Sequence, residues 1–379
     1  CLLFLQGSCS RKRLHPKINR STQTNLLLNR PLHGGNLAWA AALAGCSPSA
    51  ILDFSASINP LGPPDSAIAA IQANLKDLRA YPDPDYQHLR ATLSEVHQIP
   101  PEWILPGNGS AELLTWAGWD LAELVATYLV TPAFGDYFRA LEAFKAKVVR
   151  IPLENGEWSQ NLPIPCSQAG LLLNNPHNPT GLLFVLENIM PALEQFALVV
   201  VDEAFMDFLP PDRQQSLISV VQNYPNLVIL RSLTKFYSLP GLRLGYAIAH
   251  PDRLHRWQQR RDPWPVNVLA AAAAIAAIAD LNFQQQTWHW LEIARNQLFE
   301  ALANLPGLHP YPSAANFLLV QCDRPSSQIQ QRLLVSSQIL IRDCLSFPEL
   351  GDRFFRVAVR DIADNQRLIE GLNLVMVDG

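Results

Sequence analysis

Short apolar runs alternate with helix-like segments between about residues 104 and 250, and this alternation constrains the fold most strongly. The runs are apolar throughout, as expected of strands that are buried on both faces of a sheet. Strands that alternate with helices form mostly parallel sheets with helices on both sides, so we predict an α/β fold. The predicted strands are Ala126–Val130, Ala146–Leu153, Leu171–Asn174, Leu198–Asp202, Leu227–Leu230 and Leu244–Ala249, with helices such as Phe138–Ala146 and Leu186–Gln195 between them.

The chain continues with a pattern of a different kind. A helical region over about 268–303 is followed by β-like runs and by a closing helix at about 363–375. At 379 residues the chain is long enough for more than one domain, so we predict a second, smaller α+β domain here. The β-like runs of this domain are Phe317–Val320, Ile339–Ile341 and Phe354–Val359.

The composition excludes several kinds of partner. A net charge of −4 and a pI near 6.2 give no basic surface for nucleic acid. No apolar run approaches the roughly 18 residues of a membrane span. The six cysteines are scattered, without a C-x-x-C pair or the spacing of metal ligands. We therefore expect reduced thiols, a cytoplasmic location, no metal site, no nucleic acid and no membrane.

The first 30 residues differ from the rest of the chain. They hold six Arg or Lys and no acidic residue, and a short apolar opening precedes these charges. That order is the reverse of a secretion signal. We expect residues 1–30 to form a disordered extension, with a targeting peptide as the alternative.

One acidic motif follows a predicted strand. LVVVDEAF (198–205) places Asp202 and Glu203 at the end of a buried strand, where a carboxylate needs a cationic partner. Nucleotide hydrolases have a similar acidic strand end. They also need a phosphate loop of the form G-x-x-x-x-G-K-[ST], which this sequence lacks.

Three further motifs occur at loops. NNPHNPTG (174–181) follows a strand and is, taken alone, a good tight turn. LPGNGSAELL (105–114) is typical of a strand, a glycine turn and a helix start, whose free N–H groups favour an anion. Lys235 lies in SLTKFYSLPGLRLGY (232–246), an uncharged, turn-forming stretch in a chain with only six lysines. Each motif is weak alone, but their order along the chain is specific.

In the order and the residues of these motifs, the chain resembles the fold-type I pyridoxal-phosphate enzymes. Within them it is most similar to the group around the histidinol-phosphate aminotransferases. The resemblance runs from about His33 to Leu374. It is closest to the branch that decarboxylates L-threonine O-3-phosphate for cobalamin biosynthesis. The residues that carry it are HGGN (33–36), LDFSASINPLGPP (52–64), RAYPDPDY (79–86), NPTG, VVDEAF, LRSLTKFYSLPGLRLGY, PWPVN (263–267) and ILIRDCLSFPELGDRFFRVAVR (339–360).

The resemblance implies pyridoxal 5'-phosphate as the cofactor. Lys235 would form a Schiff base with its aldehyde, and an uncharged setting flanked by cations would favour the neutral amine. Asp202 would pair with the protonated pyridine nitrogen, Asn178 would donate to the 3-oxygen, and Phe134 would stack on the ring. An ordinary core aromatic is the alternative for Phe134. The expected phosphate-binding residues are Ser110, Ala111, Ser232, Thr234 and Arg243.

The resemblance also implies a substrate site for a small phosphorylated amino acid. Arg342 and Arg356 are the expected anion-binding arginines, together with His33, Gly35 and Asn178. Arg360 lies on the same strand face as Arg356 and could instead form an ion pair at the rim.

Two features concern the subunits and the domains. Tyr81 is expected to reach the cofactor phosphate of a partner subunit, which would make the enzyme a homodimer with shared active sites. The expected domains are an N-terminal arm with part of the small domain (31–75), a large cofactor-binding domain (76–275) and a C-terminal small domain (276–379).

One position departs from many relatives. They carry DEAY, with a tyrosine hydroxyl on the 3-oxygen of the cofactor, whereas this chain has Phe205. The decarboxylase branch also has phenylalanine there, which favours the decarboxylase interpretation.

Two other functions remain open on the sequence. The first is a histidinol-phosphate aminotransferase, which binds the same cofactor and a phosphorylated amine. HGGN and TKFYSLPGLRLGY differ from SKAFGLAGLRLGY-like aminotransferase motifs and favour the decarboxylase. The second is a transcription regulator built on the same fold, for which residues 1–30 are too short to form a helix-turn-helix module.

Overall fold

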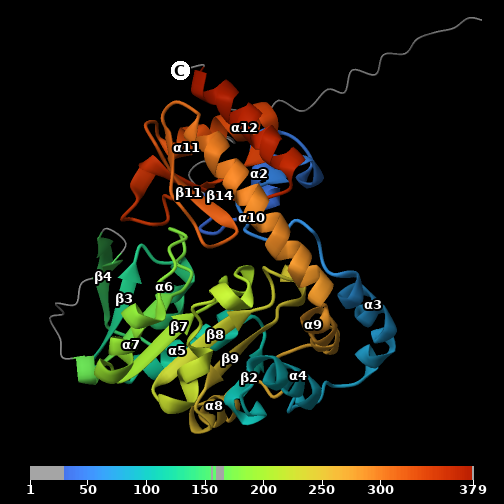
Figure 1. Ribbon diagram of the computed structural model, residues 1–379, viewed down its shortest axis with the longest axis vertical. Helices are drawn as coiled ribbons and strands as arrows, with labels where there is room; N and C mark the ends of the chain where they lie inside the picture. The colour runs from blue at the N-terminus through green and yellow to red at the C-terminus, as the bar shows by residue number, and fades with distance from the viewer. Residues whose placement is uncertain (1–29, 155–156, 159–165, 378–379) are drawn as a thin grey trace, which may run out of the picture.

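The computed structural model describes residues 30–154, 157–158 and 166–377, and the predicted α/β architecture is confirmed within them. Apart from Arg30, the predicted N-terminal extension lies outside the described residues. Figure 1 shows a lower part built on a large sheet and an upper part with a smaller sheet.

Eight strands of the described chain form the large sheet, in the order β2-β9-β8-β7-β6-β3-β4-β5. The strands from β8 through β4 run parallel, whereas β9 is antiparallel to both β2 and β8. The strand bounds are β2 Ile104–Gly107, β3 Ala126–Thr131, β4 Val148–Glu154, β5 Glu157–Trp158, β6 Ala169–Asn174, β7 Leu198–Asp202, β8 Leu227–Ser232 and β9 Gly245–Ala249.

Helices cover both faces of this sheet, which explains why its strands are apolar throughout. Val200 packs into a core shared with α5 (Ser110–Ala122), α6 (Gly135–Glu142) and α8 (Pro251–Gln258). Val199 and Val201, which point the other way, pack into a core shared with α4 (Gln87–His97), α7 (Leu186–Gln195) and α9 (Val268–Ala279).

The upper part contains an antiparallel sheet of order β10-β11-β14-β13, and its strands are β10 Leu308–Pro310, β11 Phe317–Cys322, β13 Arg342–Asp343 and β14 Phe354–Ala358. The helices α11 (Ser326–Ser337) and α12 (Ile362–Val377) lie beside it (Figure 1). The long helix α10 (Leu281–Ala303) runs from the lower part to the upper part (Figure 1).

The N-terminal segment contributes to both parts. Helix α2 (Leu37–Ala44) packs on α11, and β1 (Leu52–Asp53) pairs with β12 (Ile339–Leu340). Helix α3 (Asp65–Ala73) packs instead on α9 in the lower part. The short 3-10 helices are η1 Pro48–Ala50, η2 Leu75–Arg79, η3 Pro101–Trp103, η4 Cys166–Gln168, η5 Met206–Phe208, η6 Pro211–Arg213, η7 Leu217–Asn223, η8 Pro240–Leu242 and η9 Gly351–Arg353.

Some element boundaries were predicted wrongly. The helix predicted over Phe138–Ala146 is α6, which begins at Gly135 and ends at Glu142. It ends early because Lys145 takes a left-handed backbone conformation, with φ of 59°, that a helix cannot continue through. The strand predicted at Ile339–Ile341 is β12, which ends at Leu340, and a separate strand, β13, begins at Arg342 and pairs with a different neighbour.

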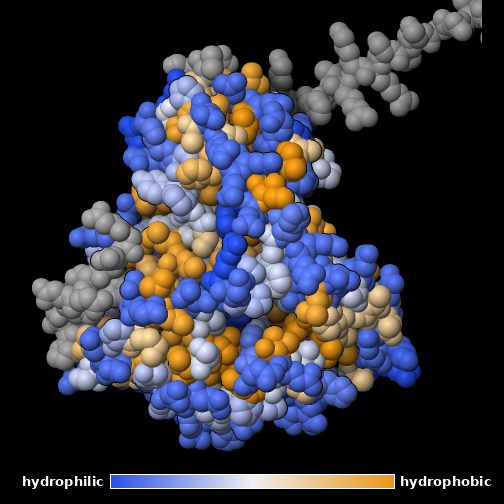
Figure 2. Space-filling model, in the orientation of Figure 1, coloured by the Kyte–Doolittle hydropathy of each residue, from blue (hydrophilic) through white to orange (hydrophobic). Residues whose placement is uncertain are grey.

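On the side shown in Figure 2, apolar residues gather in patches over the lower part and at the junction of the two parts. No single described helix is long and apolar enough to cross a membrane, and α9 and α10 reach those limits only as a pair bent by 71°.

Candidate active site

The functional motifs meet because parallel strands end at one edge of the large sheet. Asn174 of β6 pairs with Asp202 of β7, and both are the last residues of their strands. The loop that follows β3 brings Phe134 to this edge, and the turn that follows β8 brings Lys235. Such an edge is where open α/β sheets bind ligands.

A cavity of about 220 Å³ lies at this edge. It is bounded by the ends of the large-sheet strands, by the segment around Ser55 and by β14 of the smaller sheet. Its lining residues are His33, Gly34, Ser55, Ala56, Ser57, Ile58, Ser110, Phe134, Tyr137, Asn174, Asn178, Asp202, Ala204, Phe205, Lys235 and Arg356.

Lys235 is held at the floor of this cavity. Its Nζ donates to Ser232 Oγ at 3.2 Å and lies 5.3 Å from the centre of the Phe205 ring. Burial lowers the pKa of Lys235, and the guanidinium groups of Arg243 and Arg356 lower it further, against the opposing effect of Asp202. A lysine with a lowered pKa is a nucleophile suited to carbonyl compounds.

Asp202 faces the same cavity with both carboxylate oxygens engaged. Its Oδ2 accepts a hydrogen bond of 2.8 Å from the Tyr137 hydroxyl, and its Oδ1 accepts one of 2.9 Å from the Ala204 N–H. Burial raises the pKa of Asp202, whereas nearby Lys235 and these two hydrogen bonds oppose the rise. A half-buried carboxylate that lines the cavity in this way attracts a cation.

The start of α5 forms an anion-binding corner. Gly109 has φ of 75°, and a Cβ atom there would lie 2.6 Å from Arg243 Nη2, so the guanidinium lies against the backbone that opens the helix. Gly245 pairs with Ser232, and a Cβ atom on Gly245 would lie 2.6 Å from Ser110 N. The hydroxyl groups of Ser232 and Thr234 are 2.8 Å apart. The hydroxyl groups of Ser232 and Thr234, the N–H groups at the start of α5 and the Arg243 guanidinium thus surround one position. These are groups that bind an anion such as phosphate.

Asn178 and Arg356 are joined across the cavity. Arg356 Nη1 donates to Asn178 Oδ1 at 2.6 Å, which leaves the Asn178 amide N–H groups as donors. The guanidinium lies 4.6 Å from the centre of the Phe317 ring. Burial and the nearby charge of Arg342 lower the pKa of Arg356 to about 10, so it remains positive at neutral pH.

The other predicted substrate residues divide between two places. His33 lines the cavity, with its ring 5.3 Å from that of Phe134. Arg342 and Gly35 line an adjoining hollow that also touches His33. The Arg342 guanidinium donates to Pro31 O at 3.4 Å, to Leu32 O and to Ser346 Oγ at 2.7 Å, so it anchors the chain just before His33.

Two predicted residues lie away from the cavity. Tyr81 is 78% exposed and stacks on Trp264 at 4.3 Å, in a separate surface hollow that Asn108 also lines. Arg360 donates to Asp364 Oδ2 at 2.8 Å, which confirms the ion pair given above as the alternative to a substrate contact. Phe134 forms an edge contact with Tyr137 and also lines the cavity.

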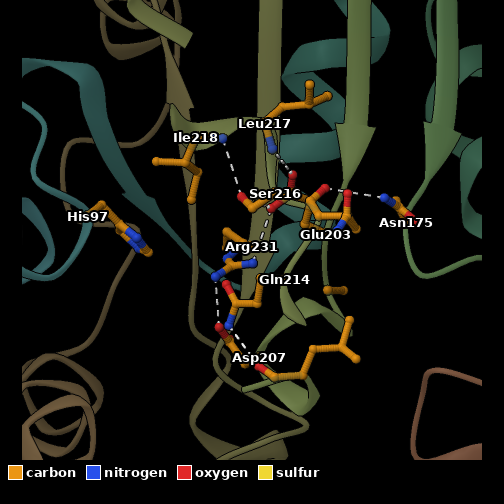
Figure 3. A network of polar contacts seen from close by, with 12 residues as sticks. His97, Asn175, Glu203, Asp207, Gln214, Ser216, Leu217, Ile218 and Arg231 are labelled. Atoms are coloured by element: carbon orange, nitrogen blue, oxygen red, sulfur yellow. Dashed lines mark hydrogen bonds and ion pairs between the residues drawn. The ribbon is translucent and has the colours of Figure 1, made fainter. Parts of the chain in front are cut away.

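A buried ionic network holds the strand ends behind the cavity (Figure 3). Arg231 of β8 donates to Glu203 Oε2 at 3.1 Å and to Asp207 Oδ1 at 2.8 Å. Glu203 also accepts from Ser216 Oγ at 2.6 Å and from Leu217 N at 2.9 Å. Because Glu203 follows Asp202 and Arg231 precedes Ser232, the network fixes the spacing of two functional strand ends.

The sequence motifs identify no partner for Tyr137, Glu203 or Arg231. Glu203 directly follows Asp202, and Tyr137 lies three residues after Phe134 on the first turn of α6. Both are therefore close in sequence to predicted site residues, and this proximity could have pointed to them. The partners of all three are distant in the sequence, and only the folded chain identifies them.

Comparison with known proteins identifies the protein family to which this chain belongs. The family model for aminotransferase class I and II matches residues 49–372, and the chain belongs to this family. The fold agrees with a solved structure, the histidinol-phosphate aminotransferase from Sinorhizobium meliloti in complex with pyridoxal-5'-phosphate. That structure is 24% identical with a TM-score of 0.80, covering 94% of this chain and 97% of that one.

Two curated relatives are similar to this chain over most of its length. The threonine-phosphate decarboxylase of Salmonella typhimurium is 40% identical, and the match covers 91% of this chain and 96% of the relative. The histidinol-phosphate aminotransferase of Symbiobacterium thermophilum is 36% identical, with coverage of 85% and 89%.

The buried network predicts a large difference between two arginine variants. Arg231→Met leaves the buried Glu203 and the half-buried Asp207 without their cation, and we expect the free energy of unfolding to fall by about 3–5 kcal/mol. Arg213→Met is the matched control, since Arg213 pairs with Glu292 at the surface, with side chains 58% and 55% exposed. It should change stability by less than about 1 kcal/mol. Chemical unfolding of both variants checks this, and equal losses would contradict the role of the network.

Proposed function

We propose that this chain catalyses the decarboxylation of L-threonine O-3-phosphate to (R)-1-amino-2-propanol phosphate, with pyridoxal 5'-phosphate as cofactor, for cobalamin biosynthesis. The observation that carries the proposal is the 40% identity, over nearly the whole length of both chains, to the Salmonella threonine-phosphate decarboxylase. The arrangement of charges in the cavity supports it independently.

The residues of the cavity suit this cofactor. The corner around Ser110, Ala111, Ser232, Thr234 and Arg243 would hold its phosphate, since a side chain at Gly109 would fill that corner. Asp202 would hold a proton on the ring nitrogen, and Phe134 would cover one ring face. Asn178 would donate to the ring 3-oxygen, because its own oxygen is already taken by Arg356.

Lys235 would hold the cofactor covalently through Nζ. The bound cofactor supplies an electron sink for the electrons of a bond broken at Cα of the substrate. A free Lys235 Nζ would lie at the cavity floor, where it could carry a proton to Cα of the substrate in place of the lost carbon dioxide. Its lowered pKa suits both holding and releasing that proton.

Arg356 would orient the substrate carboxylate. A guanidinium binds a carboxylate through two parallel hydrogen bonds and so fixes its direction. The bond that breaks is the one held perpendicular to the ring plane, so Arg356 would set the carboxylate bond in that direction. His33 and Arg342 lie on the side of the adjoining hollow, and we assign the substrate phosphate to that side.

The second candidate function is transamination of histidinol phosphate. The 36% identity to the Symbiobacterium aminotransferase favours it, and that reaction would need the same residues around the cofactor. The two reactions differ in whether the carboxylate or the hydrogen at Cα is held perpendicular to the ring.

We further propose a homodimer in which Tyr81 completes the partner's site. Tyr81 lies in the surface hollow of Asn108, next to the backbone that opens α5. Large apolar side chains are exposed in this part of the chain, as is typical of a subunit interface. Leu78 and Trp264 line the same hollow, Ile68 and Leu75 lie on α3 and η2, which pack together and on α9, and Leu281 opens α10.

The first test concerns Lys235. Borohydride reduces a carbon–nitrogen double bond to a stable amine, so treating the cofactor-loaded protein should fix the cofactor on the peptide that contains Lys235. Mass spectrometry locates the label. Lys147→Ala should be labelled like wild type and Lys235→Ala should not be labelled. Label on another lysine would end the assignment.

The second test concerns the reaction. L-Threonine phosphate should yield carbon dioxide and aminopropanol phosphate in equal amounts, and Lys235→Ala should yield neither. In parallel, histidinol phosphate with 2-oxoglutarate should yield no glutamate above background. Glutamate formation without carbon dioxide release from threonine phosphate would reverse the choice and support the aminotransferase.

The third test concerns the shared site. Tyr81→Phe and Lys235→Ala homodimers should each have low activity, and their mixture should regain activity after subunit exchange. Rescue is expected because each mixed dimer would contain one site with both native residues. If Tyr81 served its own subunit's site, the mixture would have only the average activity of the two variants.

A further inference from the structure

Tyr137 occupies a fixed position beside the carboxylate at the end of β7. Its backbone N–H donates to Phe134 O at 3.0 Å, in the first turn of α6. Its side chain is 2% exposed, and its ring meets the Phe134 ring edge-on at 5.8 Å. The hydroxyl therefore reaches Asp202 from a different element, with little freedom to move away.

The direction of the Tyr137–Asp202 hydrogen bond is settled by chemistry. Burial, and then the nearby carboxylate of Asp202, raise the pKa of Tyr137 well above its ordinary value, so the phenol stays protonated. An ionised carboxylate only accepts hydrogen bonds. Tyr137 is thus the donor at Oδ2, over 2.8 Å.

Two donors on two different oxygens fix the plane of the Asp202 carboxylate. Tyr137 donates to Oδ2 and the Ala204 N–H donates to Oδ1. Each oxygen keeps capacity to accept a further proton donor, and Asp202 lines the cavity. Hydrogen bonds to the charged form favour ionisation, which here opposes the effect of burial.

We propose that Tyr137 is a positioning residue that keeps Asp202 ionised and aimed at the ring nitrogen of the cofactor. The inference rests on the proposed cofactor function of Lys235 and Asp202. Without the hydroxyl, Asp202 becomes a stronger base and competes with the ring nitrogen for the shared proton. The ring then withdraws electrons less well, and bond breaking at Cα slows.

The variant Tyr137→Phe removes one oxygen and keeps the ring in place. We expect kcat to fall by roughly 10- to 100-fold, the usual effect of losing a hydrogen bond to a charged group, with KM changed by less than about twofold. Tyr86→Phe is the matched control, because the Tyr86 hydroxyl is also buried but bonds Val266 N at 3.0 Å and Val266 O at 3.1 Å. It should leave kcat unchanged.

Two measurements separate this role from general loosening of the fold. The nitrogen-15 NMR signal of ring-labelled pyridoxal 5'-phosphate reports protonation at the ring nitrogen, and it should move toward the unprotonated position in Tyr137→Phe alone. In an Asp202→Asn background, adding Tyr137→Phe should cause little further loss of kcat, since Tyr137 acts through Asp202.

The outcomes distinguish this inference from the proposed function. If wild type binds the cofactor but Tyr137→Phe behaves like Tyr86→Phe, the role of Tyr137 is overturned and the proposed function stands. If the losses from Tyr137→Phe and Asp202→Asn simply multiply, Tyr137 acts independently and the inference is also overturned. If wild type binds no cofactor at Lys235, both are overturned.

Discussion

Asp202 places a carboxylate at the buried end of β7, where an unpaired negative charge would be strongly unfavourable. The surrounding contacts reduce this penalty only in part, because burial still raises the pKa of the carboxylate despite Lys235, Tyr137 and Ala204. A cationic ligand in the cavity would complete the compensation. The need to balance this one charge explains why a lysine, a phenol and a backbone N–H converge on Asp202 from three separate segments of the chain.

The neighbouring acid, Glu203, shows the opposite solution to the same problem. Consecutive residues at the end of a strand point to opposite sides, so Glu203 turns away from the cavity toward Arg231 (Figure 3). Arginine cannot lose its charge at neutral pH, and this pair is therefore permanent. Asp202 faces Lys235, whose charge can change because its pKa is lowered. At the end of β7, the Glu203–Arg231 ion pair is thus structural and keeps its charges. In the neighbouring pair of Asp202 and Lys235 the lysine can change its charge, so this pair can take part in chemistry.

The sequence predicted the elements of the large sheet well because their apolar runs are long and uninterrupted. The resemblance to the pyridoxal-phosphate enzymes, rather than the strand pattern, implied the site residues, and the fold brings Phe134, Asp202 and Lys235 to one cavity because parallel strands end at one edge. It could not predict contacts that depend on side-chain direction across distant elements, such as Tyr137 with Asp202 or Arg356 with Asn178. Nor could it show that Arg342 donates to the backbone before His33, since carbonyl groups carry no sequence signal. The domain boundaries at residues 75 and 275, and the exchange of Tyr81 between subunits, stay predictions.

Under the proposed function, the choice between decarboxylation and transamination depends on how rigidly Arg356 is held. Its guanidinium is bound on one side by Asn178 Oδ1 and rests on the Phe317 ring, so a carboxylate gripped by its remaining N–H groups has a defined direction. Asn178 would at the same time touch the ring of the cofactor, which couples the direction of the carboxylate to the plane of that ring. Phe205 cannot supply the hydroxyl that a tyrosine would offer there, so Asn178 is the side chain on which that coupling depends. An arginine and an asparagine that orient each other can therefore select the bond that breaks without either one taking part in the bond breaking itself.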